Sequence, residues 1–190
     1  MSKGDFTETR LRSRRVFEGK LLRVEVDEVR LPDGTTAVRE HVVHPGAVVM
    51  IAFVDERRLL LERQYRYPLG RELYELPAGK IDPGEDPLCT AERELREETG
   101  YRARSWVRVA TLHPCVGYSN ERLIYYLARD LSFEGERPDQ GEFLEAFPLD
   151  LDEALEWVRT GRITDGKSVA GLFWAEKILR GDWPLPEPAR

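Results

Sequence analysis

Residues 79–101 read GKIDPGEDPLCTAERELREETGY, and this stretch decides how the rest of the chain is interpreted. Its apolar side chains recur at Leu88, Ala91 and Leu95, the spacing of one face of an α-helix. Gly100 follows in a position that commonly ends a helix. The pattern therefore predicts a helix over residues 87–99 that packs an apolar stripe against the core.

Three glutamates lie on one flank of this predicted helix. At about 100° per residue, Glu94 and Glu98 lie together beside the apolar stripe, with Glu97 next to them. Like charges at this spacing repel by about a few tenths of a kcal/mol per pair, and an unpaired charge near the core costs more. Arg93 and Arg96 point elsewhere on the helical wheel. A divalent cation would relieve the repulsion, and oxygen-only ligands favour magnesium or manganese. The alternative is a solvated, charged surface helix.

The spacing resembles the Nudix box: a glycine, five residues, Glu, seven residues, then Arg-Glu-aliphatic-any-Glu-Glu-any-Gly-aliphatic. The chain matches it at Gly79, Glu85, Arg93, Glu94, Leu95, Glu97, Glu98 and Gly100, with Tyr101 at the last aliphatic position. Seven fixed positions at background frequencies of about 5–7% coincide by chance on the order of 10⁻⁸. The resemblance outweighs the surface-helix alternative. It implies a Nudix hydrolase, which cleaves a nucleoside diphosphate linked to another group.

The resemblance implies magnesium as the cofactor, with manganese as a possible substitute. By position, Glu94 and Glu98 match the metal ligands of the family, and Glu97 matches a further ligand or a water-orienting group. The carbonyl of Ala78 matches another ligand. Such ions would neutralise the diphosphate and stabilise the leaving oxygen. Catalysis is therefore expected to depend on these glutamates, Glu97 and Glu98 above all.

Further residues are implied to support or complete this site. Arg93 matches the arginine that holds Glu85 or its neighbours in place, and Gly79 belongs to the same supporting set. Glu142 matches a loop glutamate that serves as a metal ligand or catalytic base. Gln140 stands where some relatives carry a second acid, and an amide cannot take a proton. The base is therefore Glu142 or Glu97, or no dedicated base is used.

Outside the box, the chain resembles the ADP-ribose pyrophosphatase branch of the family over most of its length. The segments that carry this resemblance are REHVVHPGAV (39–48), RQYRYP (63–68), GYSNERLIYYLA (117–128) and QGEFLEAFPL (140–149). It implies hydrolysis of ADP-ribose, or a similar ADP-sugar, to AMP and ribose 5-phosphate. Arg66 matches an arginine that contacts the diphosphate. Arg39 and Glu40 match residues that hold the adenine end, partly from the second subunit of a homodimer.

Composition excludes several other classes of protein. The chain has 190 residues, 41% hydrophobic and 34% charged, which excludes a disordered acidic chain and a membrane bundle. Its longest apolar run, 47–54, is far below the roughly 20 residues of a spanning helix. A net charge of −6 argues against a nucleic-acid binder. Two cysteines and no signal peptide favour the cytoplasm.

The order of the expected elements indicates a mixed α/β (α+β) fold. Strands are expected near residues 22–31, 35–43, 47–54, 59–65, 106–112, 123–128 and 143–149, and further helices at 151–160 and 167–180. The resemblance implies a Nudix α/β/α sandwich with a mixed sheet, preceded by a small antiparallel N-terminal sheet. The expected division is 1–45 for that sheet, which exchanges between subunits, 46–182 for the hydrolase domain and 183–190 for a tail.

Alternative functions stay open from the sequence. The substrate of the same chemistry is alternatively another nucleotide sugar, NADH, FAD or an oxidised nucleotide. A non-catalytic ligand sensor is disfavoured because all the box carboxylates are present. Gly166-Lys167-Ser168 matches the end of a phosphate-binding loop, but the upstream glycine and the preceding strand are missing. That motif is therefore excluded as a nucleotide-binding loop.

Overall fold

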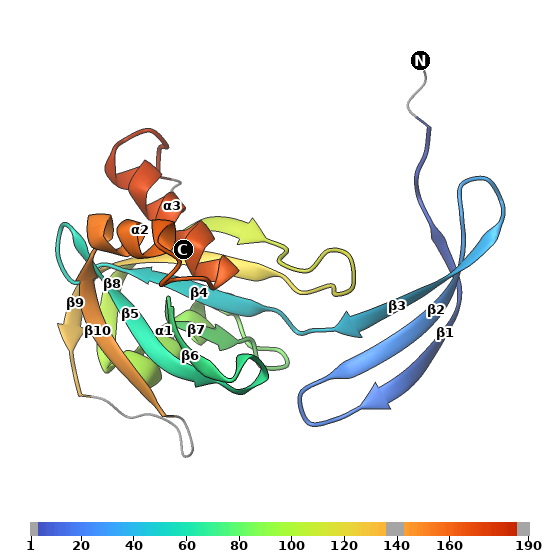
Figure 1. The fold of residues 1–190 in the computed structure, drawn as a ribbon, viewed down its shortest axis with the longest axis horizontal. Coiled ribbons are helices and arrows are strands. Elements are labelled where there is room, and N and C mark those ends of the chain that lie inside the picture. The colour runs from blue at the N-terminus through green and yellow to red at the C-terminus, as the bar shows by residue number, and fades with distance from the viewer. Residues whose placement is uncertain (1–3, 136–142, 186–190) are drawn as a thin grey trace. The chain divides into compact units, whose positions relative to one another are not determined.

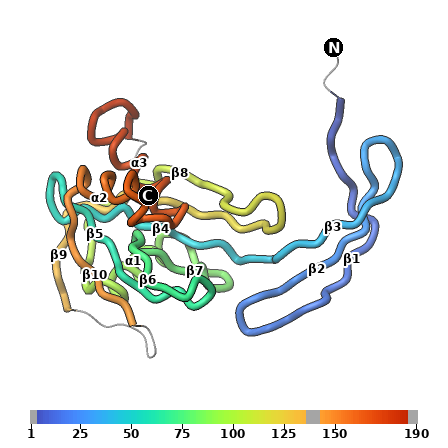
Figure 2. Tube along the Cα trace, in the orientation of Figure 1, coloured from blue at the N-terminus to red at the C-terminus, as the bar shows by residue number. Residues whose placement is uncertain are grey.

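The computed structural model describes residues 4–135 and 143–185 of the chain (Figures 1 and 2). The chain divides into two compact units. The first unit holds the residues up to Pro45 together with Cys115–Arg122. The second holds Gly46–Pro114 and the residues from Leu123 onward.

The first unit is a three-stranded antiparallel sheet in the order β1-β2-β3. Its strands are β1 (Thr9–Glu18), β2 (Arg23–Arg30) and β3 (Thr36–Val43). Gly34, with φ of 86°, lies in the turn between β2 and β3, and the Asp33 carboxylate accepts hydrogen bonds from Thr35. The later segment of this unit joins β3, because the amide of Val42 donates to the carbonyl of Tyr118. The N-terminal antiparallel sheet expected from the sequence is confirmed.

The second unit contains two sheets. The four-stranded sheet runs β7 (Ala78–Lys80), β4 (Ala47–Ala52), β9 (Leu123–Phe133) and β8 (Tyr101–Leu112). It is mixed, because β4 and β9 pair in parallel and the other neighbours pair antiparallel. The three-stranded sheet runs β10 (Leu144–Asp150), β5 (Arg58–Arg66) and β6 (Arg71–Glu75), all antiparallel. A short 3₁₀ turn, Tyr67–Leu69, joins β5 to β6.

Helices cover both faces of the mixed sheet (Figure 1). The strand β4 is buried at every position, so alternate side chains enter two different cores. Val49 and Ile51 pack with residues of α2 (Leu151–Arg159) and α3 (Gly166–Leu179). Val48 and Met50 pack with Ala91 of α1 (Pro87–Thr99). This arrangement confirms the predicted α/β/α sandwich.

The predicted helix at 87–99 is present with the same bounds as α1. The carboxylate of Asp86 accepts hydrogen bonds from the amides of Leu88 and Cys89 at its N-terminus. Gly100 ends it in the left-handed conformation, with φ of 73°. Three strands, β1, β6 and β7, lie outside the predicted strand ranges, and β8 and β9 are longer than predicted. No helix in the described ranges has the length and apolar character needed to cross a bilayer.

Candidate active site

The helix α1 and the strand β7 bring the first box residues together. A Cβ atom built on Gly79 would lie 2.0 Å from the Cδ atom of Glu94. The Glu94 carboxylate therefore rests on the backbone of β7, where any larger side chain would displace it. Ala78 is the preceding residue of that strand, held by its pairing with Val49 of β4. The structure thus places the Glu94 carboxylate beside the segment that carries the Ala78 carbonyl.

Arg93 binds several box carboxylates at once. Its Nε and Nη2 atoms donate to both oxygens of Glu85 at 3.1 Å. Its Nη1 atom lies 2.9 Å from oxygens of Glu94 and Glu97. The expectation that Arg93 points away from the carboxylate flank is wrong, because the long arginine side chain reaches sideways from its wheel position. Hydrogen bonds from Arg93, and then from Thr90, lower the pKa of Glu85 to about 2.

Two buried glutamates outside the box join this cluster. Glu62 on β5 lies directly opposite Glu75 on β6 in the strand register, with exposures of only 4% and 3%. The carboxyl group of Glu98 in the box lies close to that of Glu62. Burial raises the pKa of Glu62 well above its ordinary value. Two carboxyl groups in contact require either a shared proton or a cation between them.

Arg66 and Glu75 form a bidentate ion pair. The Nε atom of Arg66 donates to Oε1 of Glu75 at 2.6 Å, and Nη2 donates to Oε2 at 2.7 Å. Burial by itself raises the pKa of Glu75, but the bonds from Arg66 and the charge of Lys167 outweigh it and lower that pKa. The arginine side chain remains 42% exposed. Arg66 is therefore fixed on one side by Glu75 and reaches solvent on the other.

Glu62, Glu75 and Lys167 are the residues of this cluster that the sequence analysis missed. A usable signal was present for Glu62, because it directly follows the apolar run of β5 and shares its burial. A charged residue that is fully buried is uncommon unless it is paired or binds a metal. Glu75 and Lys167 depend on strand pairing and helix packing, which spacing along the chain does not reveal.

The donor atoms of this cluster fit a divalent cation. Within residues 4–135 and 143–185, no three Asp, Glu, His or Cys side chains are placed so that they already form a metal site. Nevertheless Oε1 of Glu62 is buried without a hydrogen-bond donor from that described part of the chain. The Glu94 carboxylate, from the same helix as Glu98, and the β7 backbone beside it add further oxygens. An oxygen-only donor set suits Mg²⁺ or Mn²⁺ rather than a thiolate-binding metal.

The remaining residues singled out from the sequence belong to the first unit or fall outside the described residues. Arg39 and Glu40 are on β3 in the first unit. The Arg39 guanidinium pairs with Glu8, with Nη2 2.6 Å from Oε1, and Glu40 is exposed. Glu142 and Gln140 lie outside the described residues.

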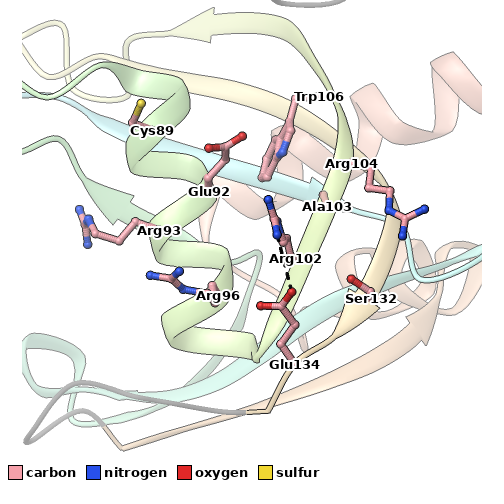
Figure 3. Close-up of a pocket in the computed structure, with 10 residues that line it drawn as sticks. All are labelled: Cys89, Glu92, Arg93, Arg96, Arg102, Ala103, Arg104, Trp106, Ser132 and Glu134. Carbon is pink, nitrogen blue, oxygen red and sulfur yellow. Dashed lines mark ion pairs between the residues drawn. The ribbon is translucent and has the colours of Figure 1, made fainter.

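A different face of α1 lines a cavity of about 750 Å³ (Figure 3). Arg102 pairs with Glu134 at 3.9 Å, and Arg93 of the carboxylate cluster also lines the cavity. Cys89, Glu92 and Arg96 line it from the helix as well. By helical geometry, these three helix residues face away from Glu94 and Glu98. Arg93 therefore belongs to both sites, because it lines the cavity and also pairs with Glu94 and Glu97.

Comparison with known proteins agrees with this geometry. The NUDIX domain family matches residues 43–170 of the chain. This chain belongs to the Nudix hydrolases. A second family, the nucleoside diphosphate sugar hydrolase N-terminal domain, matches residues 8–42.

Two curated relatives and one solved structure resemble this Nudix hydrolase over most of their length. The methanol dehydrogenase activator of Bacillus methanolicus is 40% identical over 90% of this chain and 94% of its own. The ADP-ribose pyrophosphatase of Bacillus subtilis is 37% identical over 85% of this chain and 88% of its own. The crystal structure of an ADP compounds hydrolase superposes with a TM-score of 0.84 at 27% identity, covering 95% and 98% of the two chains.

Proposed function

We propose that this Nudix hydrolase cleaves the diphosphate bond of ADP-ribose, or of a similar ADP-sugar, to AMP and ribose 5-phosphate with Mg²⁺ or Mn²⁺. The observation that carries the proposal is the packing of the Glu94 carboxylate on Gly79, beside the Ala78 carbonyl. The choice of substrate is supported by the name of the Bacillus subtilis relative.

Under this proposal, the carboxylates of Glu94, Glu97 and Glu98 and the Ala78 carbonyl hold the divalent ions, with Glu142 as a further ligand. When bound, these ions supply positive charge that neutralises the diphosphate and stabilises the leaving oxygen. Arg93 limits the repulsion among the carboxylates before the ions arrive, because it donates to Glu94 and Glu97.

The side chains also position the substrate for attack by water. Arg66 donates to the diphosphate with the N–H groups that Glu75 does not occupy. Arg39 and Glu40 hold the adenine end. The amide of Gln140 cannot accept a proton from the attacking water, so the base is Glu142 or Glu97, or no dedicated base is used. Separate Glu142→Gln and Glu97→Gln variants distinguish the two, since the base variant flattens the alkaline-rising limb of the pH–rate profile.

The organisation of the protein is part of the same proposal. Residues 1–45 form a sheet that exchanges between the subunits of a homodimer, residues 46–182 form the hydrolase domain, and residues 183–190 form a tail. The proposed location is the cytoplasm. The proposed division is supported by the family matches, because the N-terminal domain family matches residues 8–42 and the NUDIX domain matches residues 43–170.

The test is metal-dependent turnover of ADP-ribose with identification of the products. We expect AMP and ribose 5-phosphate in the presence of Mg²⁺, and none after chelation. Glu98→Gln is expected to remain folded and to lose at least about a hundredfold in kcat. Glu92→Gln, on another face of α1, is the matched control and should retain activity. A Glu98→Gln enzyme as fast as the wild type would end the proposal.

The second candidate keeps the chemistry and changes the group attached to the nucleoside diphosphate. The relative with 40% identity is named for activating methanol dehydrogenase and not for ADP-ribose, which favours testing other substrates. A panel of nucleotide sugars, NADH, FAD and oxidised nucleotides ranked by kcat/KM decides between them. ADP-ribose should rank first under the proposal stated above.

A further inference from the structure

The sequence Gly166-Lys167-Ser168 forms the first turn of α3 and is fixed there by several hydrogen bonds. The Asp165 carboxylate accepts from the Ser168 amide at 3.0 Å, from its hydroxyl at 2.6 Å and from the Lys167 ammonium at 2.8 Å. The backbone carbonyl of Lys167 accepts from the Tyr125 hydroxyl at 2.9 Å. This turn is therefore a rigid part of the second unit and not a solvated helix end.

Lys167 and Ser168 of this turn form hydrogen bonds with Glu75 and Leu76, which lead into the Nudix box. The ammonium of Lys167 donates to the carboxylate of Glu75. The hydroxyl of Ser168, which is fully buried, accepts a hydrogen bond from the amide of Leu76 at 2.7 Å. Because Ala78 follows two residues later, α3 anchors the chain immediately before the proposed metal-binding carbonyl.

The Glu75 carboxylate lies between two cations. Arg66 occupies both of its oxygens, and Lys167 shares Oε2 with that guanidinium. The Lys167 side chain is only 14% exposed and that of Glu75 only 4%. A carboxylate held from two sides in this way cannot rotate freely, so the plane of the Arg66 guanidinium is fixed with it.

The charges around Glu75 give Lys167 a second effect. Glu62 lies opposite Glu75 in the strand register, so two carboxyl groups are buried side by side. Arg66 alone would leave this buried pair of carboxyl groups short of positive charge. Lys167 supplies that charge from α3. Glu75 therefore stays ionised and keeps its ion pair with Arg66.

We propose that Lys167 is a positioning residue for the hydrolysis, which fixes the Arg66 guanidinium in the direction of the diphosphate by holding Glu75. The inference rests on the proposed role of Arg66 in diphosphate binding. The Lys167 ammonium is occupied by Glu75 and Asp165, so it acts through its neighbours.

The test compares Lys167→Met with Lys177→Met, which removes an exposed lysine from the last turn of the same helix. We expect Lys167→Met to raise KM for ADP-ribose about tenfold, with kcat changed by less than about threefold. Lys167→Arg, which keeps the charge, should restore KM to within about threefold of the wild type. Lys177→Met should leave both constants unchanged. An unchanged KM in folded Lys167→Met would overturn the inference.

A double-mutant cycle tests the route through Arg66. In an Arg66→Ala background, Lys167→Met should add little to the increase in KM, because the residue it positions is already gone. Fully additive effects would contradict the inference. If Lys167→Met does not fold, Lys167→Gln replaces it, since this variant keeps a hydrogen-bond donor and loses the charge.

Calorimetric binding of ADP separates this inference from the proposed function. Lys167→Met should weaken ADP binding about tenfold whether or not ADP-ribose is the substrate. Absence of ADP-ribose turnover in the wild type, with this loss of ADP affinity, would reject the proposed substrate alone. Full ADP affinity in Lys167→Met, with normal wild-type turnover, would reject the role of Lys167 alone.

Discussion

Gly79 leaves space for the Glu94 carboxylate, so the box glycine directly affects the position of a proposed metal ligand. Gly79→Ala would place a methyl carbon 2.0 Å from Cδ of Glu94. The backbone at Gly79 is outside the left-handed region, so alanine fits the main chain there. We expect the flexible glutamate to move and the strand to remain, so kcat falls at least about tenfold while the fold persists.

The Mg²⁺ dependence of turnover and Mn²⁺ binding by electron paramagnetic resonance measure this effect. Both should show weaker metal affinity in Gly79→Ala. Gly117→Ala is the control, because a Cβ there meets no atom within 4 Å. A Gly79→Ala enzyme with normal metal affinity would show that the Glu94 carboxylate does not depend on this contact.

Glu85 contributes to stability through its ion pair with Arg93. Its pKa is lowered from 4.5 to about 2, so the folded state binds this proton less tightly than the unfolded state. The stabilisation is complete above about pH 4.5 and is lost as the pH falls through about 2. Glu85→Gln should therefore be less stable than the wild type near neutral pH, and this difference should narrow in acid.

Urea unfolding of both proteins at about pH 6 and about pH 3 measures the two differences. Glu92→Gln provides the control for loss of an exposed carboxylate from α1. An equal stability difference at both pH values would mean that Glu85 acts through packing and not through its charge.

The residues predicted from the sequence are those whose relation is local. Glu94, Glu97 and Glu98 are set on one flank by the period of a helix, and spacing alone reveals that. Glu62 and Glu75 come together only through the register of β5 and β6. Lys167 reaches them from α3, and it is 92 residues after Glu75 in the sequence. No pattern within a short window contains such a contact.

At the scale of the element, α1 carries the box because both of its ends are fixed by local signals. Asp86 satisfies two amides of the first turn, and Gly100 accepts the left-handed conformation at the other end. Asp86→Ala should cost about 1 kcal/mol of stability, which corresponds to a lower Tm by about 2–4 °C for a chain of this size. Turnover should stay close to that of the wild type, because Asp86 does not contact the carboxylate cluster through this cap.

Thermal unfolding and steady-state kinetics check this prediction together. Asp150→Ala removes the corresponding cap of α2 and serves as the control away from the box. A fall in kcat for Asp86→Ala that exceeds the fall for Asp150→Ala would show that the N-terminus of α1 also positions the catalytic glutamates.

Two of the strands that the sequence did not predict, β6 and β7, have weak local signals. β7 has three residues, and β6 has five with no regular alternation of apolar side chains. Both exist because they pair with the strands β4 and β5, which are strongly buried. The long strands β8 and β9 likewise extend beyond their apolar segments, because each continues to pair with the other.

At the scale of the whole molecule, the first unit lacks a core of its own. Among its described residues, Val29 is the one buried apolar side chain. Several large apolar side chains of its sheet are exposed, including Leu11 at 42%, Val16 at 44% and Phe17 at 53%. A small sheet gains stability when its apolar face is buried. The proposed homodimer would bury this surface.

Leu11→Glu combined with Val16→Glu tests whether the sheet is buried in a homodimer, because charges on β1 would disfavour burial of its surface. We expect the wild type to sediment as a dimer and the double variant as a monomer. Loss of the dimer should lower the turnover of ADP-ribose, since Arg39 and Glu40 lie on the same sheet. Phe173→Glu is the control, as it charges an apolar side chain of α3 that is 48% exposed. A double variant that remains a dimer would show that the dimer interface lies elsewhere. A monomeric wild type would contradict the proposed homodimer.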